Sequence, residues 1–143
     1  MKGQHLFIRP AEAMDEHALR RLYVADEAPL PEPLVGPVAL VAKLAGTLVA
    51  HTSGEVDGPD LLIRSFYVSR ELRHKRIGRS LLIRLEELAA RMQCFRLVAA
   101  MDTPCAGFLE NAGFVQTGGI LTRNIERFPA GNDEAIIQPA PQR

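Results

Sequence analysis

The chain has 143 residues, of which 47% are hydrophobic and 24% charged, and its 17 Lys and Arg balance its 17 Asp and Glu. This composition is typical of one soluble globular domain, and the absence of an apolar run of about 18 residues argues against a membrane protein. The zero net charge argues against a dedicated nucleic-acid binder. The first ten residues lack a secretory signal pattern, so we expect a cytoplasmic protein.

The sequence predicts a strand over residues 6–8, close to Pro10, and then a helix that Asp15 caps and that ends near Asp26. Residues 28–37 contain four prolines, a density that prevents a regular helix, so this segment is predicted to be a loop.

Two β-rich runs, residues 38–44 and 47–52, are joined by Ala45-Gly46 and predict a hairpin. A strongly apolar strand follows over residues 61–68. From Ile77 the hydrophobic period becomes helical, which predicts a long amphipathic helix.

The last predicted elements are a strand over residues 95–101, a helix over 105–111 that Gly113 stops, and weaker strands over 114–115 and 120–125. This order predicts an α/β (α+β) fold. Its sheet is mixed and mostly antiparallel, with helices on both faces and a parallel strand–helix–strand crossover over residues 61–101. We expect a single domain over residues 1–128 and a poorly ordered tail over 129–143.

Metal and disulfide chemistry is not indicated by the sequence. Cys94 and Cys105 are the only cysteines, and their spacing matches no zinc or redox motif. The four histidines are scattered, without the short spacing of metal ligands. We therefore expect free thiols and no metal.

A basic turn lies between the strand that ends at Val68 and the helix that begins at Ile77. A helix N-terminus presents backbone N–H groups without intrahelical partners and a partial positive charge, which suits a pyrophosphate. Gly78 allows close approach of a ligand or backbone. The basic side chains of the turn are Arg70, Arg73, His74, Lys75, Arg76 and Arg79, opposed only by Glu71.

This turn resembles the acetyl-CoA signature of the GNAT acetyltransferase family, Arg/Gln-x-x-Gly-x-Gly/Ala. Arg73 stands at its first position, Gly78 at its last, and Arg76 replaces the middle glycine. Residues 108–114 are similar to the Phe-Tyr-Glu-Lys-x-Gly-Phe segment of the same family, with Leu109 in place of the tyrosine. The resemblance covers residues 5–126.

The resemblance implies an N-acetyltransferase that uses acetyl-CoA as cosubstrate, with the amine attacking the thioester directly in a ternary complex. Backbone amides of Tyr67 or Val68 would polarise the thioester carbonyl. The implied coenzyme-binding residues are Phe66, Tyr67, Val68, Arg73, His74, Lys75, Arg76, Ile77, Gly78, Arg79, Asp102 and Phe108.

Proton transfer is less well defined by the sequence. The family usually has a tyrosine as general acid where this chain has Leu109. A thiolate leaves without such help at a reduced rate, because a thiol pKa lies near 8.5. Tyr67 could replace the acid, although packing is the more common role of a strand tyrosine. Asp60 or His51 could accept the amine proton through water, although ordinary structural roles are favoured.

The acceptor is the least constrained feature. Arg64 interrupts an apolar strand beside the expected cleft, where it could bind a substrate carboxylate or instead pair with Asp60 or Glu55. Residues 58–65 are weakly similar to short arsenic-resistance acetyltransferases, which act on amino-acid-like arsenicals. The proline-rich segment 28–37 replaces a helix that usually closes over the substrate, which favours a small amine. A homodimer is left open.

Two other functions are compatible with the sequence. One is a catalytically degenerate relative that binds acyl-CoA as a sensor or partner protein, because Leu109 and Arg76 depart from the family pattern. The other is a nucleic-acid-binding domain that uses the basic turn, which the neutral net charge disfavours.

Overall fold

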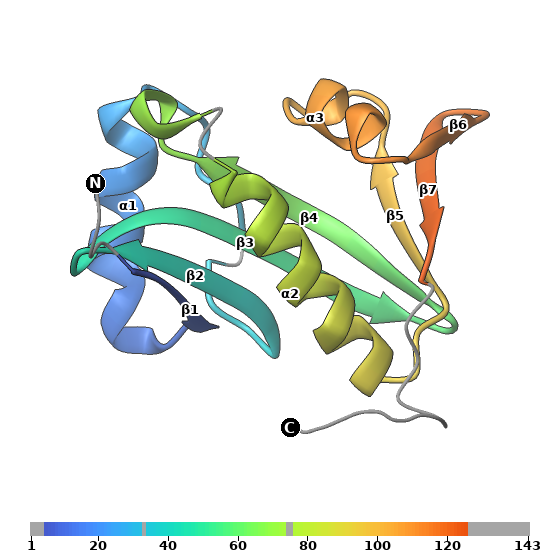
Figure 1. Ribbon diagram of the computed structural model, residues 1–143, viewed down its shortest axis with the longest axis horizontal. Helices are drawn as coiled ribbons and strands as arrows, with labels where there is room; N and C mark the ends of the chain where they lie inside the picture. Colours follow the sequence, from blue (N-terminus) through green and yellow to red (C-terminus); the bar gives the residue numbers. More distant parts are fainter. Residues whose placement is uncertain (1–4, 33, 74–75, 126–143) are drawn as a thin grey trace.

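The computed structural model describes residues 5–32, 34–73 and 76–125, which form one seven-stranded sheet with helices on both faces (Figure 1). The sheet order is β1-β2-β3-β4-β5-β7-β6. The strands are β1 (Leu6–Pro10), β2 (Val38–Leu44), β3 (Thr47–Asp57), β4 (Asp60–Val68), β5 (Arg96–Ala100), β6 (Val115–Thr117) and β7 (Ile120–Asn124). The helices are α1 (Glu16–Ala25), α2 (Ile77–Arg91) and α3 (Ala106–Asn111), with short 3₁₀ turns η1 (Ala13–Asp15) and η2 (Arg70–Leu72).

Strand direction confirms the predicted fold class. β4 and β5 run parallel and are connected through α2, whereas the other neighbouring strands pair antiparallel. The result is a mixed, mostly antiparallel sheet with a central parallel crossover. Among the described residues, no helix is long and apolar enough to cross a membrane.

The two faces of β2 show how the layers form. Successive side chains of a strand point to opposite faces of a sheet. Val38, Leu40 and Ala42 accordingly pack into one core with α2, and Ala39 and Val41 into another core with α1. α3 belongs to the α2 face, because its buried Leu109 packs into the same core as α2. The sheet is therefore covered by α2 and α3 on one face and by α1 on the other.

β4 and β5 pair only over a short stretch at their N-terminal ends, where Asp60, Leu61 and Leu62 lie opposite Arg96, Leu97 and Val98. Beyond this stretch the two strands separate, and Figure 1 shows β4 leading toward η2 while β5 leads toward α3. The sheet is thus split at its centre, and the split opens at the C-terminal ends of β4 and β5, the one parallel pair among the described strands.

Two local predictions need correction. β3 runs to Asp57 rather than ending at residue 52, because its pairing with β4 continues through a register shift at Ser53/Gly54. Asp15 makes no side-chain cap on α1; its carboxylate pairs with Arg9 at 2.8 Å and accepts the Glu12 amide at 2.8 Å. The predicted tail over 129–143 lies outside the described residues.

Candidate functional site

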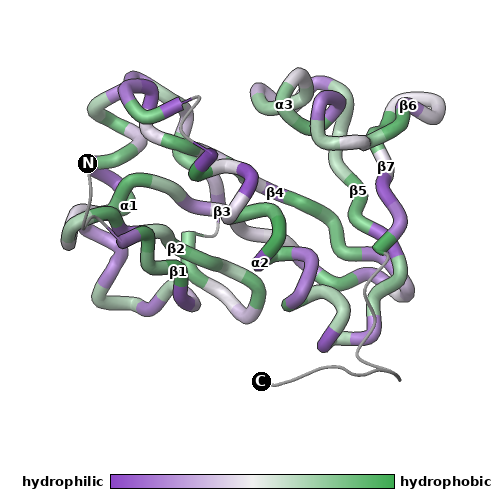
Figure 2. Tube along the Cα trace, viewed as in Figure 1, coloured by the Kyte–Doolittle hydropathy of each residue, from purple (hydrophilic) through white to green (hydrophobic). Residues whose placement is uncertain are grey.

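The turn between β4 and α2 is polar and has an unusual backbone conformation. Figure 2 shows hydrophilic residues on both sides of residues 74–75, which the structure does not describe. Arg76, the N-cap of α2, has φ 68° and ψ 6°. This left-handed conformation costs a residue with a β-carbon about 1–2 kcal/mol. Position 76, where the family motif has its middle glycine, thus has a backbone conformation that favours glycine. Arg76 adopts this conformation and adds a cationic side chain.

Gly78 lies in the first turn of α2 at a point of close contact. A β-carbon there would lie 3.2 Å from the Phe108 Cζ atom and 3.6 Å from the Val68 Cγ2 atom. A larger residue would therefore force the Phe108 ring to move. Glycine lets α2 start directly against α3 and the end of β4.

The end of β4 presents backbone groups to the split. The Ser69 amide donates to the Val49 carbonyl at 2.8 Å, on the β3 side of the strand. Amides of successive strand residues alternate in direction, so the Val68 N–H points to the open edge and the Tyr67 N–H toward β3. The Val68 carbonyl accepts a hydrogen bond from Arg73 Nε at 3.1 Å.

Asp26, just after α1, fixes this end of β4. Its carboxylate accepts hydrogen bonds from the Tyr67 hydroxyl and, at 2.8 Å, from the Arg70 amide. The Arg73 guanidinium lies 5.2 Å from the centre of the Tyr67 ring. Burial and the bond to Asp26 raise the pKa of Tyr67 to about 12. The Tyr67 proton is therefore held by Asp26, and the residue is a weaker acid than an ordinary tyrosine.

A buried polar cluster lies next to Tyr67, under α1. His51 Nε2 is 2.8 Å from the Leu34 carbonyl, and His51 Nδ1 is 2.8 Å from the Tyr23 hydroxyl. A carbonyl can only accept, so Nε2 carries the proton and Nδ1 accepts from Tyr23. Burial lowers the pKa of His51 to about 4, which keeps the ring neutral near pH 7. The Ser65 hydroxyl lies 3.5 Å from Nδ1 and 2.6 Å from the Ser53 hydroxyl.

The opposite side of the split is more apolar. The Phe108 ring of α3 stacks on Phe66 of β4, with ring centroids 5.3 Å apart. Leu109 is completely buried in the core. Cys105 is half-buried, and burial raises the pKa of its thiol. Position 109, where the family usually has its general acid, thus holds a core side chain in this chain.

A groove of about 870 Å³ lies in the split between these two sides. We call residues 65–73 together with Tyr23 and Asp26 the β4 wall, and residues 101–112 the α3 wall. The groove combines aromatic surface from Phe66 and Phe108 with strong positive charge. Among the residues that the structure describes, one carboxylate, Glu27, lines it together with five arginines, Arg64, Arg70, Arg73, Arg76 and Arg79. Such a groove suits a long ligand with an apolar arm and several negative charges.

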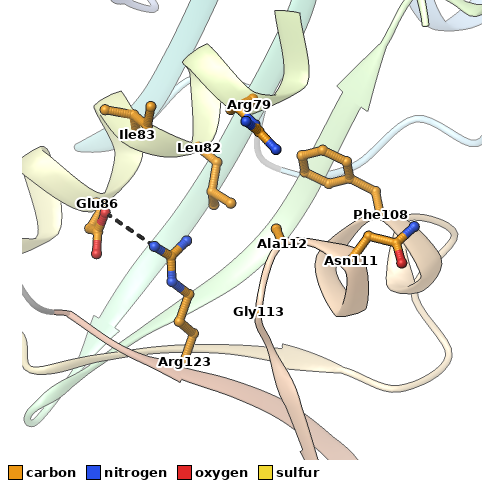
Figure 3. Close-up of a pocket in the computed structure, with 9 residues that line it drawn as sticks. All are labelled: Arg79, Leu82, Ile83, Glu86, Phe108, Asn111, Ala112, Gly113 and Arg123. Carbon is orange, nitrogen blue, oxygen red and sulfur yellow. Dashed lines mark ion pairs between the residues drawn. The ribbon is translucent and has the colours of Figure 1, made fainter. Parts of the chain in front are cut away.

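A second cavity, of about 660 Å³, continues from the groove along α2 (Figure 3). Arg79 and Phe108 line both spaces. Farther along α2 from Arg79, Arg123 extends from β7 toward Glu86, with Nη2 3.8 Å from Oε1. The buried Oε2 of Glu86 has no hydrogen-bond partner among the described residues. The groove is therefore extended by a partly polar cavity between α2 and α3.

Arg64 is paired with Glu55, one of the two partners considered from the sequence. Its Nη2 and Nε atoms lie 2.8 and 3.0 Å from the same oxygen of Glu55. Asp60 instead pairs with Arg96, at 2.9 Å, and the hydrogen bond from Arg96 lowers the pKa of Asp60. Asp60 also lies at the closed end of β4, about 26 Å of strand from Val68. This carboxylate is distant from the groove.

The other residues that the sequence predicted to bind the coenzyme differ from one another in their exposure to solvent. Ile77 is buried in the core, and Asp102 is exposed in the turn after β5. His74 and Lys75 lie outside the described residues. Within the described parts of the chain, no group of three or more His, Cys, Asp or Glu could hold a metal ion.

The sequence matches one protein family over most of its length. Residues 4–114 match the profile described as the Acetyltransferase (GNAT) family. The chain therefore belongs to this family, in which acetyl-CoA is the acetyl donor. No curated protein matches the chain in sequence.

Solved structures with the same fold include several acetyltransferases. The chain is similar to N-acetylglutamate synthase from Neisseria gonorrhoeae, solved with coenzyme A and L-arginine (TM-score 0.72, 17% identity), covering 85% of this chain and 34% of that one. It is also similar to the ribosomal-protein-S18-alanine N-acetyltransferase of Escherichia coli (TM-score 0.71, 17% identity), with 92% of this chain and 100% of that one covered. Ard1 from Thermoplasma volcanium is a third example (TM-score 0.70, 17% identity), with 85% of this chain and 99% of that one covered. The chain thus spans about a third of the synthase and essentially all of the other two, and these likenesses show the fold.

Sequence reasoning missed two residues of the β4 wall. Tyr23 follows the helical spacing of Leu19 and Leu22, so it looked like an ordinary core residue. Asp26 looked like the end of a helix. Their partners lie 28 to 44 positions away in the chain, and no local pattern in a single sequence reveals such pairs.

Proposed function

We propose that this protein is an acetyl-CoA-dependent N-acetyltransferase that transfers an acetyl group to the amine of a small molecule, by direct attack in a ternary complex. The observation that carries this proposal is the separation of β4 from β5 beside a basic helix N-terminus. The separation turns the edge of β4, including the Val68 amide, toward the groove, where an extended pantetheine arm can lie like an added strand.

The groove residues fit the parts of acetyl-CoA. The diphosphate is proposed to bind the N-terminus of α2 at Ile77 and Gly78, with Arg73, Arg76 and Arg79 supplying charge. Phe66 and Phe108 offer apolar surface to the pantetheine arm. His74, Lys75 and Asp102 remain part of this proposal on the sequence motif alone.

The chemical step is proposed to depend on backbone geometry. Of the two amides that the sequence indicated, Tyr67 and Val68, the strand alternation favours Val68 as the donor to the thioester carbonyl. Such a donor is worth about 3 kcal/mol in measured oxyanion holes. With Leu109 buried and the Tyr67 proton held by Asp26, we propose that coenzyme A leaves as a thiolate without a dedicated tyrosine acid.

The acceptor is proposed to be a small amine, such as an amino-acid analogue. The arginine excess of the groove favours an acceptor that carries an anionic group, and Arg64 lines the groove as a candidate partner for a carboxylate. Both members of the Arg64–Glu55 pair are at least half exposed. An exposed pair is worth about 0–1 kcal/mol, so a substrate carboxylate can displace Glu55 at little cost.

Two measurements test this function. A thermal-shift titration with acetyl-CoA should stabilise the protein by about 2.7 kcal/mol when the coenzyme is at 100 times its Kd. Thiol release with a panel of amino acids, polyamines and aminosugars should then reveal turnover. Coenzyme binding without turnover of any amine would favour the acyl-CoA sensor, and no binding at all would contradict both functions.

A further inference from the structure

The polar cluster under α1 reaches the groove. Tyr23 and Ser65 both line it, although Tyr23 is only 3% exposed. The Tyr23 ring is held by two aromatic contacts, with centroids 4.7 Å from the Tyr67 ring and 5.7 Å from the His51 ring. Tyr23 thus meets the groove beside Tyr67, whose neighbour Val68 points its amide into the same space. The position of its hydroxyl is fixed by packing.

The direction of the hydrogen bonds defines what Tyr23 can offer a ligand. Because the Leu34 carbonyl fixes the proton of His51 on Nε2, Nδ1 must accept the Tyr23 proton. The Tyr23 oxygen has two lone pairs; the Ser65 hydroxyl, which also hydrogen-bonds to it, takes one, and the second is left for a donor on a ligand. Tyr67, by contrast, donates to Asp26. The β4 wall therefore contains a hydrogen-bond acceptor that is uncharged, rigid and adjacent to the proposed thioester site.

We infer that the Tyr23 hydroxyl oxygen accepts a hydrogen bond from the N–H of the acceptor amine and directs the nitrogen lone pair toward the thioester carbon. This inference rests on the proposed function and adds a substrate-contacting residue that the family motifs do not contain. The neutral cluster of Tyr23, His51 and Ser65 also suits the reaction, because a buried environment disfavours the charged ammonium and favours the free amine that attacks.

The step balances without a proton stored on the protein. The nitrogen forms a bond to the acetyl carbon, the C–S bond breaks, and the sulfur leaves with the electron pair. The proton lost by nitrogen reaches the thiolate or solvent, giving an amide and coenzyme A. Tyr23 keeps its own proton on the bond to His51 throughout, so its role is to orient the amine.

The decisive variant is Tyr23→Phe, which keeps the ring and removes the hydroxyl. Leaving an amine N–H without its acceptor should lower kcat with the best amine of the panel by about tenfold to hundredfold. The acetyl-CoA thermal shift should stay unchanged. Ser53→Ala is the matched control, because it removes a buried hydrogen bond of the same cluster without touching the groove; it should lose stability and retain kcat.

The possible results separate this inference from the proposed function. If the wild type turns over an amine and Tyr23→Phe has the same kcat, the inference fails and the function stands. If the wild type binds acetyl-CoA but acetylates no amine, the transferase function fails and the inference with it. An equal fall of kcat in Ser53→Ala would reveal a merely structural role.

A measurement on the unmodified protein covers the case in which Tyr23→Phe does not fold. Nitrogen-15 NMR of His51, with acetyl-CoA bound, should show the tautomer protonated on Nε2. A ring protonated on Nδ1 would donate to Tyr23 and turn the tyrosine proton toward the groove, which would overturn the inference.

Discussion

The two walls of the groove are built by different forces. The β4 wall is held by polar bonds: Asp26 binds Tyr67 and Arg70, and His51 binds Tyr23. The α3 wall is held largely by packing, through the buried Leu109 and the stacked Phe108. Hydrogen bonds fix atoms in direction, whereas apolar contacts tolerate small shifts. For the proposed transferase we therefore expect the β4 wall to hold the backbone and hydroxyl groups of the reaction site in fixed directions.

The largest expected effect tests the packed wall. Leu109→Ala should lower the free energy of unfolding by about 3–4 kcal/mol, because it leaves a cavity at a fully buried site. Urea unfolding would measure the loss. Val115→Ala, at a 62% exposed position, should change it by less than about 0.5 kcal/mol. Similar values for both variants would show that α3 is not anchored by Leu109.

A charge at the junction of the two walls should abolish coenzyme binding. Gly78→Glu places bulk against Phe108 and negative charge at the proposed phosphate site, so the stabilisation of about 2.7 kcal/mol at 100 times the Kd should disappear. Gly119→Glu, where a β-carbon meets nothing within 4 Å, should keep it. Circular dichroism would verify that both variants fold. A normal shift in Gly78→Glu would contradict the proposed site.

The polar wall should make stability depend on pH. Because the folded pKa of His51, about 4, lies below the unfolded value of 6.5, the unfolded chain binds more protons between these values. The contribution of neutral His51 to the free energy of unfolding is complete above about pH 6.5. It is lost as the pH falls toward 4, by about 2–3 kcal/mol at pH 4.5. Urea unfolding at pH 7 and pH 4.5 measures it. His51→Gln should flatten this dependence, and an unchanged slope in that variant would assign the effect to other groups.

The smallest expected effect concerns the turn at the end of the β4 wall. Arg76→Gly should raise the free energy of unfolding by about 1 kcal/mol, because glycine adopts the left-handed backbone without strain. Arg76→Ala removes the same charge but keeps the β-carbon, so it should bring no such gain. Both variants should bind acetyl-CoA more weakly than the wild type. Equal stability of the two in thermal unfolding would show that the turn is not strained.

The sequence predicted the order of elements, the mixed sheet and its parallel crossover, because hydrophobic period and turn residues are local signals. The motif also indicated Gly78, and the contact with Phe108 supplies a packing reason for a glycine there. The sequence did not predict the roles of Asp26 and Tyr23, since these roles arise from partners that are brought together only by folding. The preference for Val68 over Tyr67 likewise needed the strand register, which composition does not reveal.

The split between β4 and β5 has a consequence for how the molecule transmits motion. Strand pairing joins the two half-sheets at three residue pairs near Leu61, and beyond this short seam they are held together through the core that they share with α2. A ligand that pairs with the edge at Val68 would bridge the halves and stiffen the seam. Deuterium uptake at amides on both edges should then slow together, although only one edge touches the reacting group.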